Sequence, residues 1–413
     1  MSQEENAKTL VLVIGASGFI AGHIIKQLCE RGYQVRGTVR KYKKENYEYL
    51  LDLQKRQGQI EFIECDLTKD DNWDEAVKGV KYVIHTANPM PDTDMSESGG
   101  FGGGSNRNKT PLTDDDYIKP AVDGMTRILN AIRDHGKSIK RIVYTSSIGS
   151  INWECWDTVG TGKKIVYTHS GTWTPIGRCH VNFFQIRFTL AEQLGFEFVK
   201  KHDKYEFTTI LPGLVVGPLL NDRKPMSMTS LQMCLNGEYP VVPRIQWGVV
   251  DVREVATAHV NAMTAPNAPG KRYLLVGECL WYKDMVELMA YKYSKLGYPV
   301  PTMEPPEFVV KLLSYIDPEI GNFVLPINNL KRFVDHRPSV EDLDVIYRPP
   351  HETIIEACED LIKKGHVRKP PSTLQRAVKK GAIVGVGLTA LVGSVYIFGG
   401  KEKLEEIKSK ILG

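Results

Sequence analysis

Apolar and polar positions along residues 9–40 follow the order expected of a strand, a turn, a helix and a second strand. "LVLVI" is a continuous apolar run, as found in strands that are buried on both faces of a parallel sheet. Glycines come next, and apolar residues then recur at helical spacing before a second strand pattern. These residues therefore predict one strand–helix–strand unit.

The same alternation continues to about residue 147. We expect strands in "IEFIECDL", ending at Asp66, in "YVIHTA" and in "RIVYTSS", and helices over "DNWDEAVKGV" and residues 115–135. A polar, glycine-rich run, "SESGGFGGGSNRN", interrupts the pattern and predicts a surface insertion. Strands that alternate with helices are typical of an α/β fold of the Rossmann type, a doubly wound parallel sheet with helices on both faces.

The glycines between the first strand and helix have the spacing of a dinucleotide-binding turn. Gly15 allows the tight turn, and Gly18 lets the backbone approach a pyrophosphate that rests on the helix N-terminus. Ala21 takes the third, close-packing place. Because these residues lie between a predicted strand and helix, they indicate a nicotinamide dinucleotide site.

The end of the second strand predicts which dinucleotide binds. Sites for NAD usually carry an acidic residue there, but this chain reads "TVRKYKK", with Arg40 and Lys44 among four cations and no acid. Cations suit a 2′-phosphate, so the sequence favours NADP, that is NADPH in its reduced form. A solvated basic turn is the alternative interpretation.

The C-terminal region differs from the rest. Residues 382–399 carry no charge, and as a helix they would extend roughly 27 Å, close to the thickness of a bilayer's hydrocarbon core. We expect a linker at 366–378, a transmembrane helix at 379–400 and a charged tail at 401–413. A buried C-terminal helix is the alternative. The polar N-terminus is not typical of a secretory signal, so the main domain is expected in the cytosol, anchored to the endoplasmic reticulum or the mitochondrial outer membrane.

Composition narrows the function classes. The 413 residues are 42% hydrophobic and 25% charged, as in globular proteins, and the net charge of +4 is too small and dispersed to argue for nucleic acid. The seven cysteines are scattered, which favours reduced thiols and gives no zinc-type pairs, so no metal site is predicted. A small-molecule substrate is therefore the expected partner, and a homodimer stays open.

The ordered motifs "GASGFIAGHI", "GTVR", "CDL", "HTANP", "KRIVYTSSIGS", "LPGLVVGP" and "VDVREVATAHV" resemble the extended short-chain dehydrogenases/reductases of the NAD-dependent epimerase/dehydratase superfamily. The resemblance is to the branch of dihydroflavonol reductases, cinnamoyl-CoA reductases and 3β-hydroxysteroid dehydrogenases. It implies a domain over 8–365, with a Rossmann core over about 8–215 plus returning segments and a substrate lobe mostly over 216–350. It also implies an NADP-dependent oxidoreductase that acts on CH–OH or C=O groups.

The resemblance implies site residues by position. Ser147 matches the serine that polarises the substrate, although Ser146 is adjacent and the register could differ by one. The residues implied to contact the cofactor are Gly15, Ser17, Gly18, Phe19, Ile20, Arg40, Lys44, Asp66, Leu67, Thr86, Ala87 and Pro212.

One motif departs from the family pattern. The family carries Tyr-x-x-x-Lys on the helix after "TSS", and "TLAE" at 189–192 places Phe184 at the tyrosine and Phe188 at the lysine. Phenylalanine has no proton to give to a developing alkoxide, and loss of a positioned acid typically lowers the rate by a factor of about 10²–10⁴. The letters "YKYSK" at 291–295 fit the motif, but they lie in the expected lobe.

Three interpretations remain open. In the first, the chain is an active oxidoreductase with another proton donor, which is either His180 or Ser147 acting through water. In the second, it is an NADP-binding module that regulates a membrane-associated partner. A third, an epimerase or dehydratase, is disfavoured because that chemistry also relies on the Tyr/Lys pair. Five aromatic residues could line an apolar substrate pocket or simply pack: Phe101, Trp153, Trp156, Trp173 and Trp247.

Overall fold

The computed structural model describes residues 3–88, 114–151, 165–176, 183–239, 241–315 and 320–370. Several predicted features lie outside these residues: the glycine-rich run at 96–108, Phe101, Trp153, Trp156, His180 and the apolar segment at 379–400. Among the described residues, no helix is both long and apolar enough to cross a membrane.

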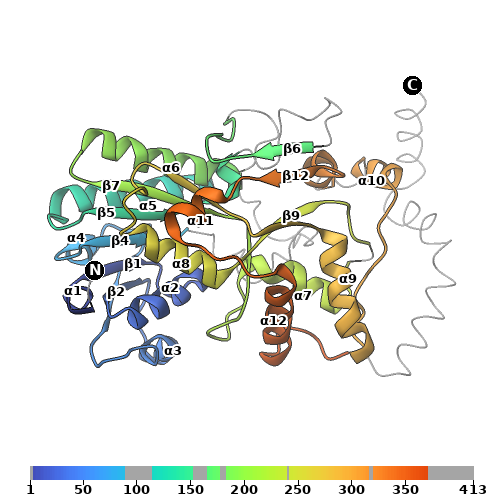
Figure 1. Ribbon diagram of the computed structural model, residues 1–413, viewed down its shortest axis with the longest axis horizontal. Coiled ribbons are helices and arrows are strands. Elements are labelled where there is room, and N and C mark those ends of the chain that lie inside the picture. Colours follow the sequence, from blue (N-terminus) through green and yellow to red (C-terminus); the bar gives the residue numbers. More distant parts are fainter. Residues whose placement is uncertain are drawn as a thin grey trace.

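A seven-stranded parallel sheet forms the centre of the molecule (Figure 1). Its order is β10-β7-β5-β4-β1-β2-β3, and each neighbouring pair runs parallel. The strands are β1 (Leu10–Ile14), β2 (Gln34–Val39), β3 (Ile60–Glu64), β4 (Tyr82–His85), β5 (Arg141–Thr145), β7 (Glu206–Pro212) and β10 (Arg272–Leu275). The order reverses between β1 and β4, which is where open sheets of this kind bind ligands. The predicted Rossmann fold is confirmed.

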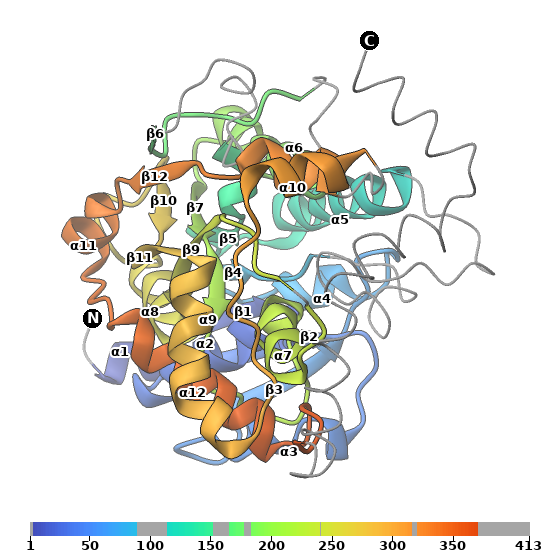
Figure 2. The same cartoon turned by 90° about the vertical axis from the view of Figure 1, so that its right-hand side faces the viewer.

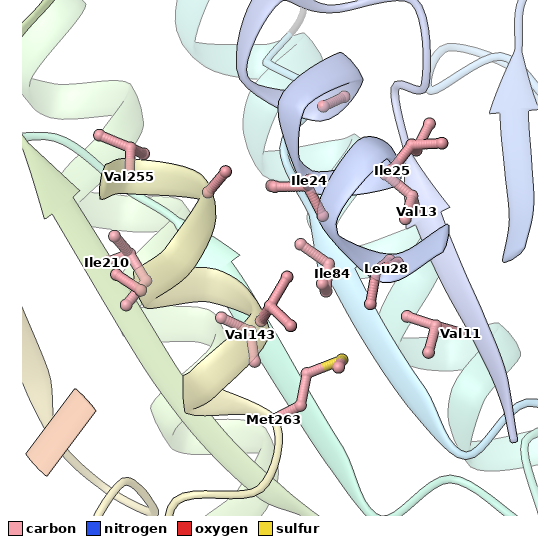
Figure 3. Packing of buried hydrophobic residues seen from close by; sticks show 14 of the residues in the cluster. Val11, Val13, Ile24, Ile25, Leu28, Ile84, Val143, Ile210, Val255 and Met263 are labelled. Atoms are coloured by element: carbon pink, nitrogen blue, oxygen red, sulfur yellow. The ribbon is translucent and has the colours of Figure 1, made fainter. Parts of the chain in front are cut away.

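Helices cover both faces of the sheet because successive strand residues point to opposite sides. Val11 and Val13 pack with helices α2 (Phe19–Glu30) and α8 (Val252–Ala262), and Figure 3 shows Ile24 and Leu28 of α2 and Val255 of α8 on this face. Leu12 and Ile14 face a second cluster instead. That cluster packs under α4 (Trp73–Val77), α5 (Asp114–His135) and α6 (Phe183–Lys201).

A second lobe lies beside the main sheet, on the right of Figure 1, and Figure 2 shows it from the front. Its three-stranded sheet comprises β8 (Leu214–Val216), β9 (Gln246–Asp251) and β11 (Glu278–Trp281). Around it pack α7 (Thr229–Asn236), α9 (Tyr282–Tyr293), α10 (Glu307–Ser314) and α12 (Pro350–Lys363). A separate parallel pair joins β6 (Ile165–Thr168) to β12 (Lys331–Val334).

Short segments complete the described elements. They are the helices α1 (Gln3–Ala7), α3 (Glu48–Leu51) and α11 (Arg337–Leu343), and the short helical turns η1 (Lys44–Asn46), η2 (Ile148–Ile151), η4 (Met226–Met228), η5 (Ser294–Leu296), η6 (Ile320–Val324) and η7 (Leu325–Ile327).

The predicted strands and helices are present, with some boundaries shifted. The strand expected to end at Asp66 ends at Glu64, because the Asp66 carboxylate accepts hydrogen bonds from the backbone N–H and hydroxyl of Thr68 and so forms a turn. The strand in "RIVYTSS" likewise ends at Thr145, which leaves both serines in the following turn. The "YKYSK" letters lie in α9 and η5 of the lobe.

Candidate active site

The parallel sheet brings the predicted cofactor residues to one edge. Gly15 follows β1, Arg40 follows β2, and Thr86 follows β4, while Ser147 lies two residues past β5 and Pro212 ends β7. Because all these strands run in the same direction, their carboxyl ends meet at the same side of the sheet. We call this side the carboxyl edge.

The glycine turn after β1 is closed by contacts that a side chain would prevent. Gly15 has a φ of +84°, and a Cβ built on it would lie 2.8 Å from the Cβ of Ala87. Its backbone N–H donates to the hydroxyl of Thr38 at 3.1 Å, and the N–H of Gly18 donates to the carbonyl of Gly15 at 2.9 Å. The turn is therefore held against both neighbouring strands.

The N-terminus of α2 follows this turn directly. Gly18 is the N-cap, no side chain caps the helix, and the first turn carries no acidic residue. The first backbone N–H groups, from Phe19 and Ile20, have no partner within their own helix and carry the positive end of its dipole. Ser17 is only half-buried. This geometry suits a dinucleotide's pyrophosphate.

Cations and an aromatic cluster surround the end of β2. Arg40 and Lys44 are both exposed, and Lys44 begins η1. The rings of Tyr42, Tyr47 and Phe62 pack together with centroid separations of 5.2–5.7 Å. This cluster, which sequence reasoning missed, supports the basic loop between β2 and β3.

Asp66 lies in the turn that follows β3. Burial raises the pKa of its carboxyl group, but hydrogen bonds from Thr68 and the charges of Lys69 and Arg40 outweigh burial and hold that pKa below its usual value. Asp66 is therefore an ionised acceptor within electrostatic reach of Arg40. The neighbouring Leu67 packs against Gly124 of α5, where an added Cβ would lie 3.2 Å away.

The segment after β4 lies against the glycine turn. The backbone N–H and the hydroxyl of Thr86 both donate to the carbonyl of Ile14, at 3.1 and 2.9 Å, and Ala87 contacts Gly15. Sequence reasoning missed Asn88. Both polar atoms of its side-chain amide are buried, without a hydrogen-bond partner among the described residues. An amide without a partner at this place is suited to a ligand's polar group.

The two serines after β5 have different surroundings. Ser146 donates to the buried carboxylate of Glu192 at 2.8 Å, and its hydroxyl oxygen lies 3.2 Å from that of Ser150. The hydroxyl oxygen of Ser147 instead accepts from the N–H of Gly149 at 3.1 Å, which leaves its hydrogen available as a donor. This difference supports Ser147 as the serine that contacts a substrate.

Helix α6 carries the two phenylalanines at the Tyr and Lys positions. The backbone of Phe184 is helical, and its side chain lies outside what the structure describes. Phe188 is 8% exposed, with the guanidinium carbon of Arg187 5.1 Å from its ring centroid. The position at which the family carries lysine is thus apolar in this chain, and the residue before it, Arg187, is a buried cation.

A buried ion pair that sequence reasoning missed fixes α6 to the loop after β5. Glu192 accepts from Arg272 at 2.7 and 3.1 Å and from Thr209 at 2.6 Å. Arg272 also donates to backbone carbonyls of Ser170 and Thr172. Its guanidinium carbon lies 3.6 Å from the ring centroid of the predicted pocket residue Trp173. This network therefore fixes the position of the segment that carries Ser147.

Two histidines near the carboxyl edge are neutral at physiological pH. Burial lowers the pKa of His85 to about 3 and that of His259 to about 4. The Nδ1 of His259 donates to the carbonyl of Val255, so its Nε2 accepts from the hydroxyl of Thr145 at 2.7 Å. Neither imidazole is an acid able to protonate an alkoxide readily at neutral pH.

Comparison with known proteins identifies the family. Residues 11–277 match the model of the NAD dependent epimerase/dehydratase family. The chain belongs to this family. The predicted superfamily is confirmed.

Relatives in the NAD-dependent epimerase/dehydratase family agree with the predicted branch. The chain is 30% identical over 323 residues to a bifunctional dihydroflavonol 4-reductase/flavanone 4-reductase from Malus domestica, an alignment that covers 74% of this chain and 84% of the relative. It is 28% identical over 371 residues to cinnamoyl-CoA reductase 2 from Arabidopsis thaliana, covering 89% and 97%. These relatives are reductases, so the chain belongs to an oxidoreductase branch of the family.

Solved structures show the same fold. The yeast methylglyoxal/isovaleraldehyde reductase Gre2, in complex with NADPH, matches with a TM-score of 0.68 and 23% identity, covering 87% of this chain and 100% of that one. Vestitone reductase from alfalfa matches with a TM-score of 0.61 and 22% identity, covering 87% and 99%. Both the Rossmann core and the lobe therefore have counterparts of known structure.

Proposed function

We propose that this protein is an NADP-dependent oxidoreductase that interconverts C=O and CH–OH groups of a small, apolar substrate, with an active site that lacks the Tyr/Lys pair. The observation that carries the proposal is the carboxyl edge. The glycine turn, the uncapped N-terminus of α2 and Ser147 all lie there in the order that the family uses. Only the positions of Phe184 and Phe188 depart from it.

The preference for NADP rests on charge. Arg40 follows β2 directly, Lys44 lies on the same exposed loop, and the residues between them include no acid. Arginine and lysine bind phosphate through charge-assisted hydrogen bonds, whereas a ribose 2′-hydroxyl calls for an acceptor. The NADPH in the yeast Gre2 structure supports the same cofactor for a relative in fold.

Reduction of a carbonyl requires a hydride and a proton. The reduced cofactor supplies the hydride when it is bound. The Ser147 hydroxyl donates a hydrogen bond to the carbonyl oxygen, which places the substrate and stabilises the charge that develops on that oxygen. A phenylalanine at 184 supplies no proton, so in our proposal the proton reaches the oxygen from water through Ser147. His180 is the second candidate donor.

The proposed apolar substrate would bind between the carboxyl edge and the lobe. Trp247 on β9 packs edge-on against Tyr282 at 6.2 Å, and Trp173 packs against Phe196 and under Arg272. Both residues have packing partners, so they would form the wall of a pocket without having to rearrange. The two plant relatives are named for the reduction of dihydroflavonols, flavanones and cinnamoyl-CoA, and flat apolar groups of that kind fit such a wall.

The second candidate function is an NADP-binding module without turnover. Phe184 and Phe188 favour it, because the cofactor edge is retained while the proton donor and its activating cation are absent. Two measurements separate the candidates: NADPH binding by fluorescence, and NADPH oxidation with a panel of aromatic and aliphatic carbonyls. Binding with slow turnover supports the oxidoreductase. Binding without any turnover supports the module, and absence of NADPH binding contradicts both.

We also propose that residues 379–400 anchor the protein to the endoplasmic reticulum or mitochondrial outer membrane, with the main domain in the cytosol. The uncharged stretch at 382–399 and the basic residues before it support this proposal. A truncation ending at Thr373 should be soluble, while the full chain should resist extraction by alkaline carbonate. Equal extraction of both would contradict the anchor.

A further inference from the structure

The loop after β8, over residues 217–225, packs against the part of the Rossmann core that follows the glycine turn. Its Leu220 approaches Gly22 of α2 so closely that a Cβ built on Gly22 would lie 3.3 Å from a methyl carbon of Leu220. Tyr49 and Leu50 of α3 border the same place, each with a side-chain carbon 3.9 Å from that Cβ. The loop therefore lies where α2 and α3 meet, beside the segment that follows β2.

The same loop brings Arg223 close to the basic segment between β2 and β3. The hydroxyl of Tyr47 donates to the backbone carbonyl of Lys41 at 3.1 Å, so it lies directly on this segment. Burial raises the pKa of Tyr47, and the charges of Arg223 and Arg40 both oppose that rise. Burial also raises the pKa of Tyr49, and the charge of Arg223 again opposes it. Two arginines from segments far apart in the sequence therefore lie near the same tyrosine hydroxyl.

The residues on either side of Arg223 hold this loop in place. Asp222 forms an ion pair with Lys364, just after α12, at 3.2 Å. The ammonium group of Lys224 donates to the hydroxyl of Thr229 on α7 at 2.9 Å. Arg223 itself is exposed, and its guanidinium forms no ion pair within the described part of the chain. It is therefore a cation on an anchored loop, available to an anionic ligand.

We propose that Arg223 binds the 2′-phosphate of NADP(H) from the side of the lobe and completes the cationic site that Arg40 and Lys44 begin on the core. This inference rests on the proposed function, since it needs NADP(H) at the carboxyl edge. A phosphate monoester carries close to two negative charges at neutral pH, so a single cation does not balance it. Arginine also presents a planar fork of donors that matches phosphate oxygens. NADH has an uncharged ribose hydroxyl at this place, which gives Arg223 no charge to bind.

The test compares the dissociation constants of NADPH and NADH, measured by fluorescence titration of the full chain at one fixed salt concentration. The variant R223Q removes the charge and keeps a polar side chain. We expect it to weaken NADPH binding by about tenfold, the usual loss of one charge-assisted contact, and to change NADH binding by less than about twofold. R223K keeps the charge and should retain most of the NADPH affinity. In competition titrations, R223Q should weaken binding of 2′-AMP and leave that of 5′-AMP unchanged.

A matched control comes from α11, which packs beside β10 at the end of the sheet opposite to β3. R337Q makes the same chemical change at an exposed arginine there and should leave both affinities unchanged. Unchanged NADPH affinity in R223Q overturns the inference. Equal losses for NADPH and NADH also overturn it, because they would assign Arg223 to a part that both cofactors share. Either result leaves the proposed function standing, whereas failure of the wild type to bind NADPH contradicts the proposed function itself.

Discussion

At the scale of single residues, we predict that cofactor choice depends on Arg40, an exposed side chain after β2. Arg40→Ala removes the cation best placed for a 2′-phosphate. We expect NADPH affinity to fall by about ten- to a hundredfold, the range for a charge-assisted contact of about 1.5–3 kcal/mol, and NADH affinity to stay nearly constant. Fluorescence titration measures both. Lys137→Ala, an exposed cation before β5 at the opposite edge of the sheet, is the control.

The two phenylalanines of α6 give the second prediction at this scale. The double change Phe184→Tyr and Phe188→Lys would supply a proton donor and its activating charge. We expect NADPH-dependent carbonyl reduction to rise by up to about 10²–10⁴-fold, the usual worth of a positioned acid. Stopped assays with the best substrate of the panel measure the change. Fast wild-type turnover that Phe184→Leu does not alter would contradict this role.

Phe188→Lys alone tests where this residue points. Phe188 is 8% exposed, and burying an ammonium without a partner is unfavourable. The variant should therefore unfold at a lower temperature than the wild type, and NADPH should restore much of the difference if the ammonium meets the cofactor. Thermal unfolding with and without NADPH gives the answer. Equal stabilisation of variant and wild type by NADPH would show that the introduced ammonium lies away from the cofactor.

At the scale of elements, the Glu192–Arg272 pair connects α6, β7 and β10. Arg272→Met leaves the fully buried Glu192 carboxylate without its cation, which should lower the free energy of unfolding by about 3–5 kcal/mol. Lys78→Met breaks an exposed pair with Glu75 on α4 and should lower the free energy of unfolding far less, because solvent screens this pair. Denaturant titration compares the two. Similar effects would show that the buried network contributes little.

The elements also show how far the sequence can predict this structure. The spacing of apolar residues along the sequence predicts the strands and helices. The glycine turn is predicted because its glycines lie between a strand and a helix. The partners of Glu192 could not be predicted, because Arg272 lies 80 residues away along the chain and each of the two residues alone is typical of a solvated surface. The buried position of Arg187 was missed for the same reason. A cation in an amphipathic helix is expected on the exposed face. Only the packing of α6 against α5 and η2 shows that Arg187 is buried.

At the scale of the whole molecule, buried histidines make stability depend on pH. The pKa of His85 is about 3 in the folded protein and near 6.5 when exposed, so the unfolded chain binds the additional proton. The stabilisation is complete above about pH 6.5 and is lost as the pH falls toward 3. His85→Phe should reduce the slope of unfolding free energy against pH by about 1.4 kcal/mol per unit in this window.

Denaturant titrations between pH 4 and 7 measure that slope. His85 packs against Tyr144, and its Nδ1 has no hydrogen-bond partner among the described residues, so an apolar ring should fit with little loss. His135→Gln, on the exposed end of α5, is the control. An unchanged slope in His85→Phe would show that this histidine titrates in the folded protein as it does in the unfolded chain.

The return of the chain to the main sheet after the first lobe strands has a consequence for biosynthesis. About sixty residues separate the end of β7 from the start of β10, and α8 lies between them. A ribosome that adds roughly 5–20 residues per second needs several seconds for this stretch. During that interval, the nascent chain exposes the unpaired side of β7 and the apolar surface that α8 later covers. A fragment ending at 215 leaves these surfaces uncovered and should therefore aggregate, whereas one ending at 373 should fold.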